Sequence, residues 1–305
     1  MSRVFCVGDL NVDLFTYSNE KPVFGEEKNV PLINYSLGGN AANFAVALSS
    51  LGEEVFLVSV LGHDVFTNFL KKELAKAKVK SLLINSKSLN GVSNIFVGKK
   101  GERGILSIKN CLDELDCKTV SKKILPKLKK GDVVYFGGFF HLLKMRNGFV
   151  TLLQKIHKKN CLIAFDATFD EYGKWEVKSF LKYIDLFFVN EKELEKICKT
   201  KNCSKAITKL FSWGGKEVIV KKGAMGAEYF SSKMNISINA LKKKVINSTG
   251  AGDFFNAGYL FGLINKYTVV TCLRIGVFVA SKRIEQKEFF TPSKKQVNVY
   301  LKKLS

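Results

Sequence analysis

Several features that are common in proteins are scarce or missing in this sequence. Only four of the 305 residues are proline, and only five of the 49 basic residues are arginine. No run of about eighteen apolar residues occurs, so we expect no membrane-spanning helix. The first ten residues lack the basic, apolar and small-residue zones of a signal peptide, which favours a cytoplasmic protein.

Cysteine is present but in no pattern typical of a structural bridge. The seven cysteines are an odd number and include no CxxC pair. This spacing argues against a disulfide framework and against a zinc site. Reduced thiols in a cytoplasmic protein are the expected state.

Acidic residues are few, and the 27 carboxylates leave a net charge of +22. Such a charge permits three interpretations: phosphate contacts with nucleic acid, attraction of an anion such as ATP, and compositional drift. Dedicated phosphate-binding surfaces favour arginine, which pairs with phosphate bidentately, and arginine is rare here. We therefore favour drift and expect no specific nucleic-acid partner.

Two familiar nucleotide-binding motifs are absent. The sequence contains neither the P-loop pattern GxxxxGK[ST] nor the dinucleotide pattern GxGxxG. If the protein transfers phosphate, it must therefore hold the phosphates in a cradle of another kind.

Short apolar runs alternate with helical patterns along the chain. The runs predict buried strands, and the periodic segments predict helices that include Ala41–Leu51 and Phe254–Leu263. This alternation predicts one α/β domain, residues 1–305, with a mostly parallel sheet covered on both faces. The predicted strands are Val4–Val7, Val55–Leu61, Val133–Phe136, Leu162–Phe165, Leu186–Val189 and Val218–Val220.

Two segments break the alternation. Residues 13–32 and 91–108 are rich in turns and short extended runs. They predict strands of a separate small sheet inserted in the domain.

The strongest chemical signal is the segment Gly250-Ala251-Gly252-Asp253, which precedes a helical run. Small residues allow a tight turn that exposes consecutive N–H groups. At a helix N-terminus these groups and the helix dipole favour an anion such as a transferring phosphoryl group. Asp253 lies beside this anion hole, where its carboxylate can accept the proton of an attacking hydroxyl.

A second signal is Gly38-Gly39-Asn40-Ala41-Ala42-Asn43. Two glycines before a helix of small residues let a ligand approach the backbone. The amides of Asn40 and Asn43 both donate and accept hydrogen bonds, which suits the hydroxyls of a sugar.

These two segments resemble the signature motifs of the ribokinase-like (PfkB-type) carbohydrate kinases. Further matches follow in the family's order, so the resemblance covers nearly the whole chain. It implies a kinase that uses ATP and Mg²⁺, with a doubly wound, mostly parallel sheet. It also implies a β-sheet lid formed by residues 13–32 and 91–108, through which relatives often form a homodimer.

The resemblance also assigns roles to individual residues. In the catalytic group, Gly250, Ala251 and Gly252 form the anion hole and Asp253 is the base. The acceptor would lie against Asn11, Asp13, Gly39, Asn40 and Asn43. The nucleotide would be held by Asn190, Glu193, Lys222, Gly223, Gly226 and, from the lid segment Gly101-Glu102-Arg103, Arg103. Glu193 would act on magnesium through water, because that ion keeps several waters.

Departures from the family pattern bear on the acceptor. Asn40 replaces a lysine of ribokinases proper, and Asp170 stands where kinases of acid sugars have an arginine. A neutral sugar is therefore the expected acceptor. A nucleoside kinase of the same family stays open, and so does a non-catalytic nucleic-acid-binding protein on a kinase scaffold. His141 follows a predicted strand, and two roles stay open for it: a contact with the substrate pocket and a structural role, which is the commoner one for a lone histidine at such a place.

Overall fold

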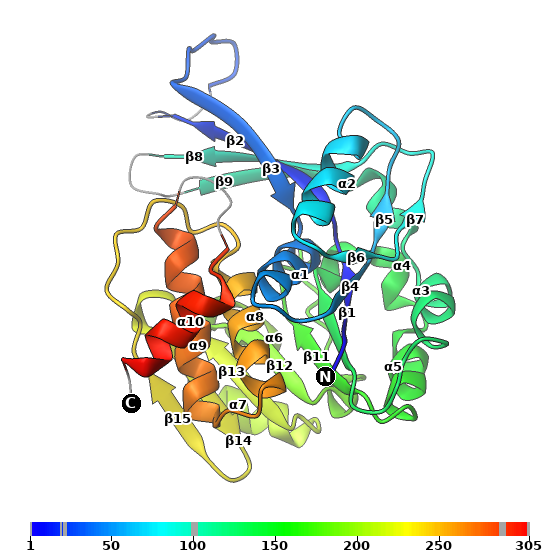
Figure 1. Cartoon of the computed structure of the whole chain (residues 1–305), viewed down its shortest axis with the longest axis vertical. Helices are drawn as coiled ribbons and strands as arrows, with labels where there is room; N and C mark the ends of the chain where they lie inside the picture. The colour runs from blue at the N-terminus through cyan, green and yellow to red at the C-terminus, as the bar shows by residue number, and fades with distance from the viewer. Residues whose placement is uncertain (1, 19, 21–22, 99–102, 287–290, 304–305) are drawn as a thin grey trace.

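The computed structural model describes residues 2–18, 20, 23–98, 103–286 and 291–303. A nine-stranded sheet forms the centre of the molecule (Figure 1). Its order is β15 (Asn235–Ile238), β14 (Ala227–Ser231), β13 (Glu217–Lys221), β12 (Leu186–Asn190), β11 (Leu162–Asp166), β10 (Val133–Gly137), β1 (Val4–Gly8), β4 (Val55–Val58) and β6 (Lys80–Ser81). The strands from β13 to β6 are parallel, and β14 and β15 are antiparallel additions at one edge. The predicted fold class, a doubly wound and mostly parallel sheet, is confirmed.

Helices cover both faces of this sheet because successive strand residues point to opposite sides. Val4 and Cys6 join the core cluster on one face, and Phe5 and Val7 join the cluster on the other. The first cluster includes α1 (Asn40–Ser50), α2 (Thr67–Lys76), α8 (Ala251–Ile264), α9 (Val269–Ile284) and α10 (Lys294–Lys302). The second includes α3 (Cys117–Ile124), α4 (Leu143–Arg146), α5 (Phe149–His157), α6 (Glu191–Cys198) and α7 (Cys203–Ser212).

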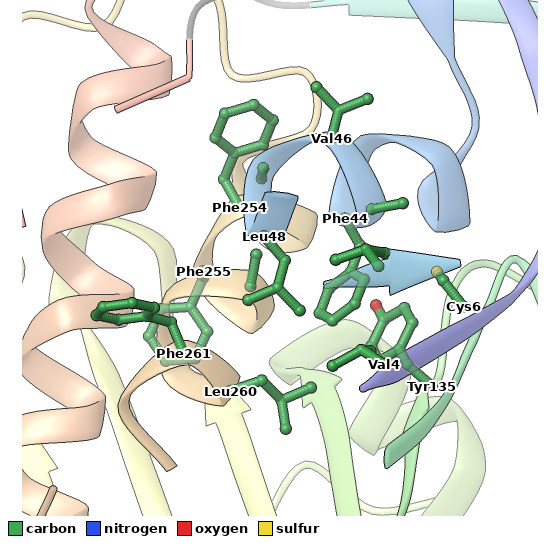
Figure 2. Close-up of a cluster of buried hydrophobic side chains, with 14 of the residues drawn as sticks. Val4, Cys6, Phe44, Val46, Leu48, Tyr135, Phe254, Phe255, Leu260 and Phe261 are labelled. Carbon is green, nitrogen blue, oxygen red and sulfur yellow. The ribbon is translucent and has the colours of Figure 1, made fainter. Parts of the chain in front are cut away.

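The packing of α8 fixes the position of the site. Figure 2 shows Phe254, Phe255, Leu260 and Phe261 of α8 gathered with side chains of α1 and the sheet. A Cβ atom on Gly258 would lie only 2.9 Å from the Cα of Gly276, so α8 and α9 pack backbone to backbone. This close packing holds the N-terminal end of α8 in place.

A second, four-stranded sheet stands apart from the large one (Figure 1). Its order is β3 (Leu32–Gly38), β2 (Asn11–Tyr17), β8 (Gly91–Val97) and β9 (Arg103–Ile108). This is the small sheet that the sequence predicted, with different limits. The described residues between Tyr17 and Leu32 form turns and irregular chain, and β3 runs on to Gly38. The predicted segments also contain residues 19, 21–22 and 99–102, which lie outside the described part.

One predicted strand is divided in two. Val55–Leu61 breaks at Ser59 into β4 and β5 (Val60–Leu61), and β5 pairs with β7 (Ile84–Asn85) in a small sheet of its own. All seven cysteines are free thiols. None of the described helices is both long and apolar enough to span a bilayer.

Candidate active site

Several side chains with catalytic chemistry lie at the carboxyl ends of the parallel strands. Asp9 follows β1, Asp166 ends β11, Asn190 ends β12 and Lys221 ends β13. Carboxyl ends of parallel strands meet at one edge of the sheet, and ligands of open α/β folds bind there. The N-terminus of α8 joins this edge through Asp253, which accepts a hydrogen bond from Asn43 of α1.

Asp253 lies in the first turn of α8 and is only 3% exposed. Its two carboxylate oxygens each accept one amide hydrogen bond of 3.1 Å, from Nδ2 of Asn40 and Nδ2 of Asn43. Burial, together with the charge of Asp166, raises the pKa of Asp253 well above its usual range. A carboxyl group held in this way is oriented to exchange a proton with a neighbouring ligand.

The loop before Asp253, residues 247–252, has the geometry of an anion site, and we call it the anion loop. Gly250 precedes α8 with φ of 77°, a left-handed conformation that favours glycine. No side chain caps this helix end, and among the described residues no backbone carbonyl accepts a hydrogen bond from the N–H of Gly252 or of Asp253. These N–H groups are therefore available to an anion at the positive end of the helix.

A cavity of about 460 Å³ opens beside this loop. Ser248, Ala251 and Gly252 line its end at the helix, and Gly223 and Gly226 line it from the turn after β13. The rest of the wall is largely apolar and includes Leu241, Val245, Phe255, Val277 and Ile284. An apolar chamber that ends at an anion loop fits a ligand with a flat apolar body and a charged tail, and its volume lies in the usual range for small-molecule sites.

Lys221 is the lysine that approaches the loop. Its ammonium is 2.6 Å from Oδ1 of Asp166, and both side chains are largely buried. A Cβ atom on Gly252 would lie 3.4 Å from the Lys221 ammonium, so the two are neighbours. Burial lowers the pKa of Lys221, but the charges of Asp166 and Glu193 outweigh burial and the pKa is raised. A positive charge at this place can stabilise phosphate oxygens.

The motif residue Lys222 points elsewhere. Its ammonium pairs with Glu228 at 2.9 Å, and it does not line the cavity beside Gly252. Sequence reasoning therefore overlooked Lys221. The signal that reveals it is the strand register, in which Lys221 is paired with Asn190 at the carboxyl ends of β13 and β12.

Asn190 and Glu193 bind each other at the start of α6. The Asn190 side chain accepts from the backbone N–H of Glu193 at 2.9 Å, and the Glu193 carboxylate accepts from the N–H of Asn190 at 2.8 Å. Burial raises the pKa of Glu193 to about 8, against the opposing charge of Lys221. The described residues contain no group of three or more potential metal ligands. A magnesium ion held mainly by phosphates and water, with Glu193 in an outer position, fits this arrangement.

A second group of site residues lies on β2 and at the start of α1. Nδ2 of Asn11 donates to Oδ1 of Asp13 at 2.9 Å and lies 3.0 Å from Oγ of Ser93. A Cβ atom on Gly38 would lie 2.1 Å from Oδ1 of Asp13, so any other residue at this position would displace the Asp13 carboxylate. Gly39 has φ of 97° and precedes α1. Burial raises the pKa of Asp13 to about 7.

The small sheet reaches the anion loop through Arg103. Nη1 of Arg103 in β9 donates to Oγ1 of Thr249 at 3.0 Å. Thr249 is itself held by a 2.9 Å bond from its N–H to Oδ1 of Asn247. Gly101 and Glu102 of the same predicted segment lie outside the described residues.

An arginine from another part of the chain, Arg146, lies beside Asp170, the residue that stands where kinases of acid sugars have an arginine. Nη2 of Arg146 is 2.9 Å from Oδ1 of Asp170, whose side chain is fully buried. The guanidinium also lies over the rings of Phe140 and Tyr172. His141 ends the same turn as Phe140, and burial lowers its pKa. The positive charge of Arg146 is thus already neutralised by Asp170.

Comparison with known proteins decides the family. The model of the pfkB family carbohydrate kinases matches residues 1–296. The chain belongs to this family. It is 27% identical to an uncharacterized sugar kinase of Archaeoglobus fulgidus over 246 residues, which cover 79% of this chain and 95% of the relative. It is 24% identical to a deoxyribokinase of Salmonella typhi over 306 residues, which cover 97% of each chain.

Solved structures show the same fold. A putative ribokinase II from Escherichia coli, in complex with ATP and magnesium, superposes with a TM-score of 0.86 at 19% identity and covers 99% of this chain and 100% of its own. The predicted family and fold are confirmed by these matches. Identities this low leave the roles of individual residues as predictions.

Proposed function

We propose that this protein transfers the γ-phosphoryl group of ATP to a hydroxyl of a neutral sugar, with Asp253 as the general base. One observation carries the proposal: a buried carboxylate, oriented by Asn40 and Asn43, lies in the first turn of a helix whose N-terminal N–H groups are available to an anion. Phosphoryl transfer to a hydroxyl needs a base for the hydroxyl proton and, next to it, a site that binds the phosphate. This helix end supplies both.

The nucleotide would occupy the cavity beside α8. Its base would lie among Leu241, Val245 and Phe255, and its phosphates would reach the N–H groups of Gly252 and Asp253. The E. coli neighbour with the same fold is in complex with ATP and magnesium, which supports this ligand. Magnesium, when bound, supplies positive charge to the phosphates, and Glu193 with Asn190 would orient its waters.

The acceptor would lie between the small sheet and α1. Asp13 and Asn11 offer a carboxylate and an amide that suit neighbouring hydroxyls, and Asn43 donates to the proposed base, Asp253. The Arg146 charge is neutralised by Asp170, and Arg103 donates to Thr249 beside the phosphate loop, so neither arginine is assigned to an acid group of the acceptor. This supports a neutral acceptor, either a free sugar or, as the alternative, the ribose of a nucleoside.

The chemistry follows from these positions. The acceptor oxygen forms a bond to the γ-phosphorus in line with the bridging oxygen, and the bond to ADP breaks. The hydroxyl proton passes to the carboxylate of Asp253. The loop N–H groups and the Lys221 ammonium stabilise the charge on the transferring group. The small sheet, closing through Arg103 onto Thr249, would exclude water and limit hydrolysis of ATP.

The first experiment replaces the base. We expect Asp253→Asn to retain the fold and ATP binding and to lose roughly 10²–10⁴ of kcat, the usual effect of a general base. Asp185→Asn is the matched control, because Asp185 precedes β12 at the opposite end of the strand and pairs with Lys216. Near-normal turnover in Asp253→Asn would remove Asp253 from the mechanism.

The second experiment identifies the acceptor. Ribose, deoxyribose, fructose, adenosine, inosine and cytidine are compared with 2-keto-3-deoxygluconate and sugar phosphates in one coupled assay. We expect the highest kcat/KM for a neutral compound. Preference for an acid sugar or a sugar phosphate would contradict the proposed acceptor and leave the role of Asp253 untouched.

A further inference from the structure

A second cavity, of about 650 Å³, lies away from the site described above. Its walls come from the chain after β11, from the end of α6 and from α7. Five lysines line it: Lys174, Lys178, Lys182, Lys199 and Lys209. We call it the lysine groove. No residue lines both this groove and the cavity beside α8.

The charge of the lysine groove is concentrated and unneutralised. Five of its eleven lining residues are lysine, against 49 basic residues in the chain of 305. The only acidic residue in its lining is Glu176. Within the described part of the chain none of the five lysines forms a salt bridge, whereas Lys216 nearby in sequence pairs with Asp185 at 2.6 Å. Lysine is therefore far denser in this lining than along the chain as a whole, and one glutamate leaves most of that charge unbalanced.

The lysine groove also has an apolar floor and an aromatic wall. Trp175, Val177 and Ile197 line it and are buried. Trp213 is half-buried, and the ammonium of Lys209 lies 5.3 Å from the centre of its ring. Such a lining offers contact to the organic part of a ligand as well as to its charge.

Part of the lysine groove is held in place by the fold. The Lys209 ammonium donates to the carbonyl oxygen of Cys198 at 3.0 Å, at the C-terminal end of α6. A Cβ atom on Gly214 would lie 2.7 Å from Cβ of Lys182, so the turn that follows Trp213 packs directly on Lys182. The ammonium of Lys209 and the backbone at Lys182 are therefore held before any ligand arrives, which reduces the entropy cost of binding.

We propose that the lysine groove is a second binding site, for a small organic phosphate that carries several negative charges. Five lysines against one glutamate suit a ligand with three or four negative charges, and the apolar floor suits its organic part. The volume is that of a small-molecule site. Binding to a nucleic-acid backbone needs positive charge spread along a track, whereas these five lysines surround one hollow.

Helix α6 connects the lysine groove with the candidate active site, because residues of both lie on it. Glu193 lies in the first turn of this eight-residue helix, and Ile197 lies at the other end in the groove wall. At about 1.5 Å of rise per residue the helix is roughly 12 Å long. The two sites are thus separate places joined by one short rigid element.

The chain provides its own probe for this site. It has only two tryptophans, Trp175 and Trp213, and both line the lysine groove. Tripolyphosphate, which absorbs no light at the wavelengths used, is titrated into the full chain without Mg²⁺ or acceptor while tryptophan fluorescence is recorded. We expect a saturable change, with inorganic phosphate binding more weakly because it carries less charge.

Matched variants separate site binding from general attraction. Lys174→Gln with Lys178→Gln is expected to raise the Kd about tenfold, because each lost charge contact weakens binding up to about fivefold. Lys71→Gln with Lys72→Gln, the same loss of charge on exposed positions of α2, is expected to leave the Kd unchanged. If the first pair does not fold, Lys199→Gln with Lys209→Gln replaces it.

Three results would overturn the proposal: no saturable change in fluorescence, equal weakening by the α2 pair, or tighter binding of oligothymidylate than of tripolyphosphate. The last would assign the lysine groove to single-stranded nucleic acid. None of these readouts depends on kinase activity, so they test the second binding site independently of the proposed function.

Discussion

The carboxyl group of Asp253 is subject to opposing effects on its pKa. Burial raises the pKa and the charge of Asp166 adds to that, while the amides of Asn40 and Asn43 lower it. The net effect is a pKa well above the usual range. A base that titrates this high is lost to protonation at a pH where an ordinary aspartate, with a pKa of about 3.9, is still ionised.

This predicts the acidic limb of the rate profile. We expect kcat/KM to fall as pH is lowered, with a midpoint well above pH 4, because only ionised Asp253 accepts the hydroxyl proton. Asn40→Ala removes one donor that favours the ionised form, and should move the midpoint to higher pH. A profile of kcat/KM against pH measures both. A midpoint near 4 would show that Asp253 ionises like an exposed carboxyl.

The raised pKa of Asp13 predicts that the stability of the folded chain depends on pH. Its pKa is raised from 3.8 to about 7 in the folded chain, so the folded state holds the proton more tightly than the unfolded state. Its contribution to stability is therefore complete below about pH 4 and is lost as pH rises through about 7. We expect Asp13→Asn to raise the melting temperature at pH 8 more than at pH 5. The measurement is thermal unfolding at both values, with Asp185→Asn as the control.

Sequence reasoning could find Asp253 and the loop before it because these residues are neighbours in the chain. Gly250 and Gly252 predict a tight turn, and a helical pattern follows them. Lys221 could not be found in this way. Its neighbour Lys222 fits the local motif, and only the register of β13 against β12 shows which of the two lysines faces Asp166.

At the scale of elements, the small sheet contacts the anion loop through the side-chain bond from Arg103 to Thr249. We predict that this bond favours the closed arrangement. Arg103→Ala should raise the KM for the acceptor several-fold and increase hydrolysis of ATP without acceptor, because a looser lid admits water.

Thr249, which accepts the hydrogen bond from Arg103, supplies the control for this experiment. Thr249→Val removes the accepting hydroxyl at nearly constant volume, and the double variant should be no worse than Arg103→Ala alone if the two side chains act through one bond. Acceptor KM and ATP hydrolysis in all four proteins give the comparison. Additive effects would show that Arg103 acts on something other than Thr249.

The outer strand of the small sheet carries a further prediction. All six residues of β9 are exposed, and three of them are large and apolar: Ile105, Leu106 and Ile108. An exposed apolar edge strand readily pairs with another chain. We predict a homodimer through this edge. Light scattering should report twice the mass of 34.1 kDa, and Leu106→Lys should return the monomer. A monomeric wild-type chain at high concentration would exclude this contact.

The elements themselves were predictable where their pattern is local. Long helices and buried strands follow from apolar periodicity, but the break of Val55–Leu61 at Ser59 does not. The residues on both sides of Ser59 are apolar, and only the pairing of β4 with β1 and of β5 with β7 separates them. The limits of β3 were missed for the same reason, because its partner β2 determines where it ends at Gly38.

For the molecule as a whole, the unusual property is its net charge of +22. The proposed function uses little of it, since Lys221 is already paired with Asp166. The lysine groove gathers around one cavity five lysines that form no salt bridge with the described residues. The remaining lysines lie largely on exposed positions of separate elements, such as Lys71 and Lys72 of α2 and Lys295 of α10.

A charge spread in this way predicts weak, non-specific attraction to nucleic acid. Binding should rest on the release of counterions from phosphates, so the affinity for any oligonucleotide should fall steeply between about 50 and 200 mM salt. It should also differ little between sequences, because with five arginines the chain has few bidentate base contacts to offer. Fluorescence anisotropy with several labelled oligonucleotides at both salt concentrations measures this. A preference for one sequence that survives physiological salt would restore the nucleic-acid-binding alternative, and loss of that binding in the Lys174→Gln, Lys178→Gln protein would locate it in the lysine groove.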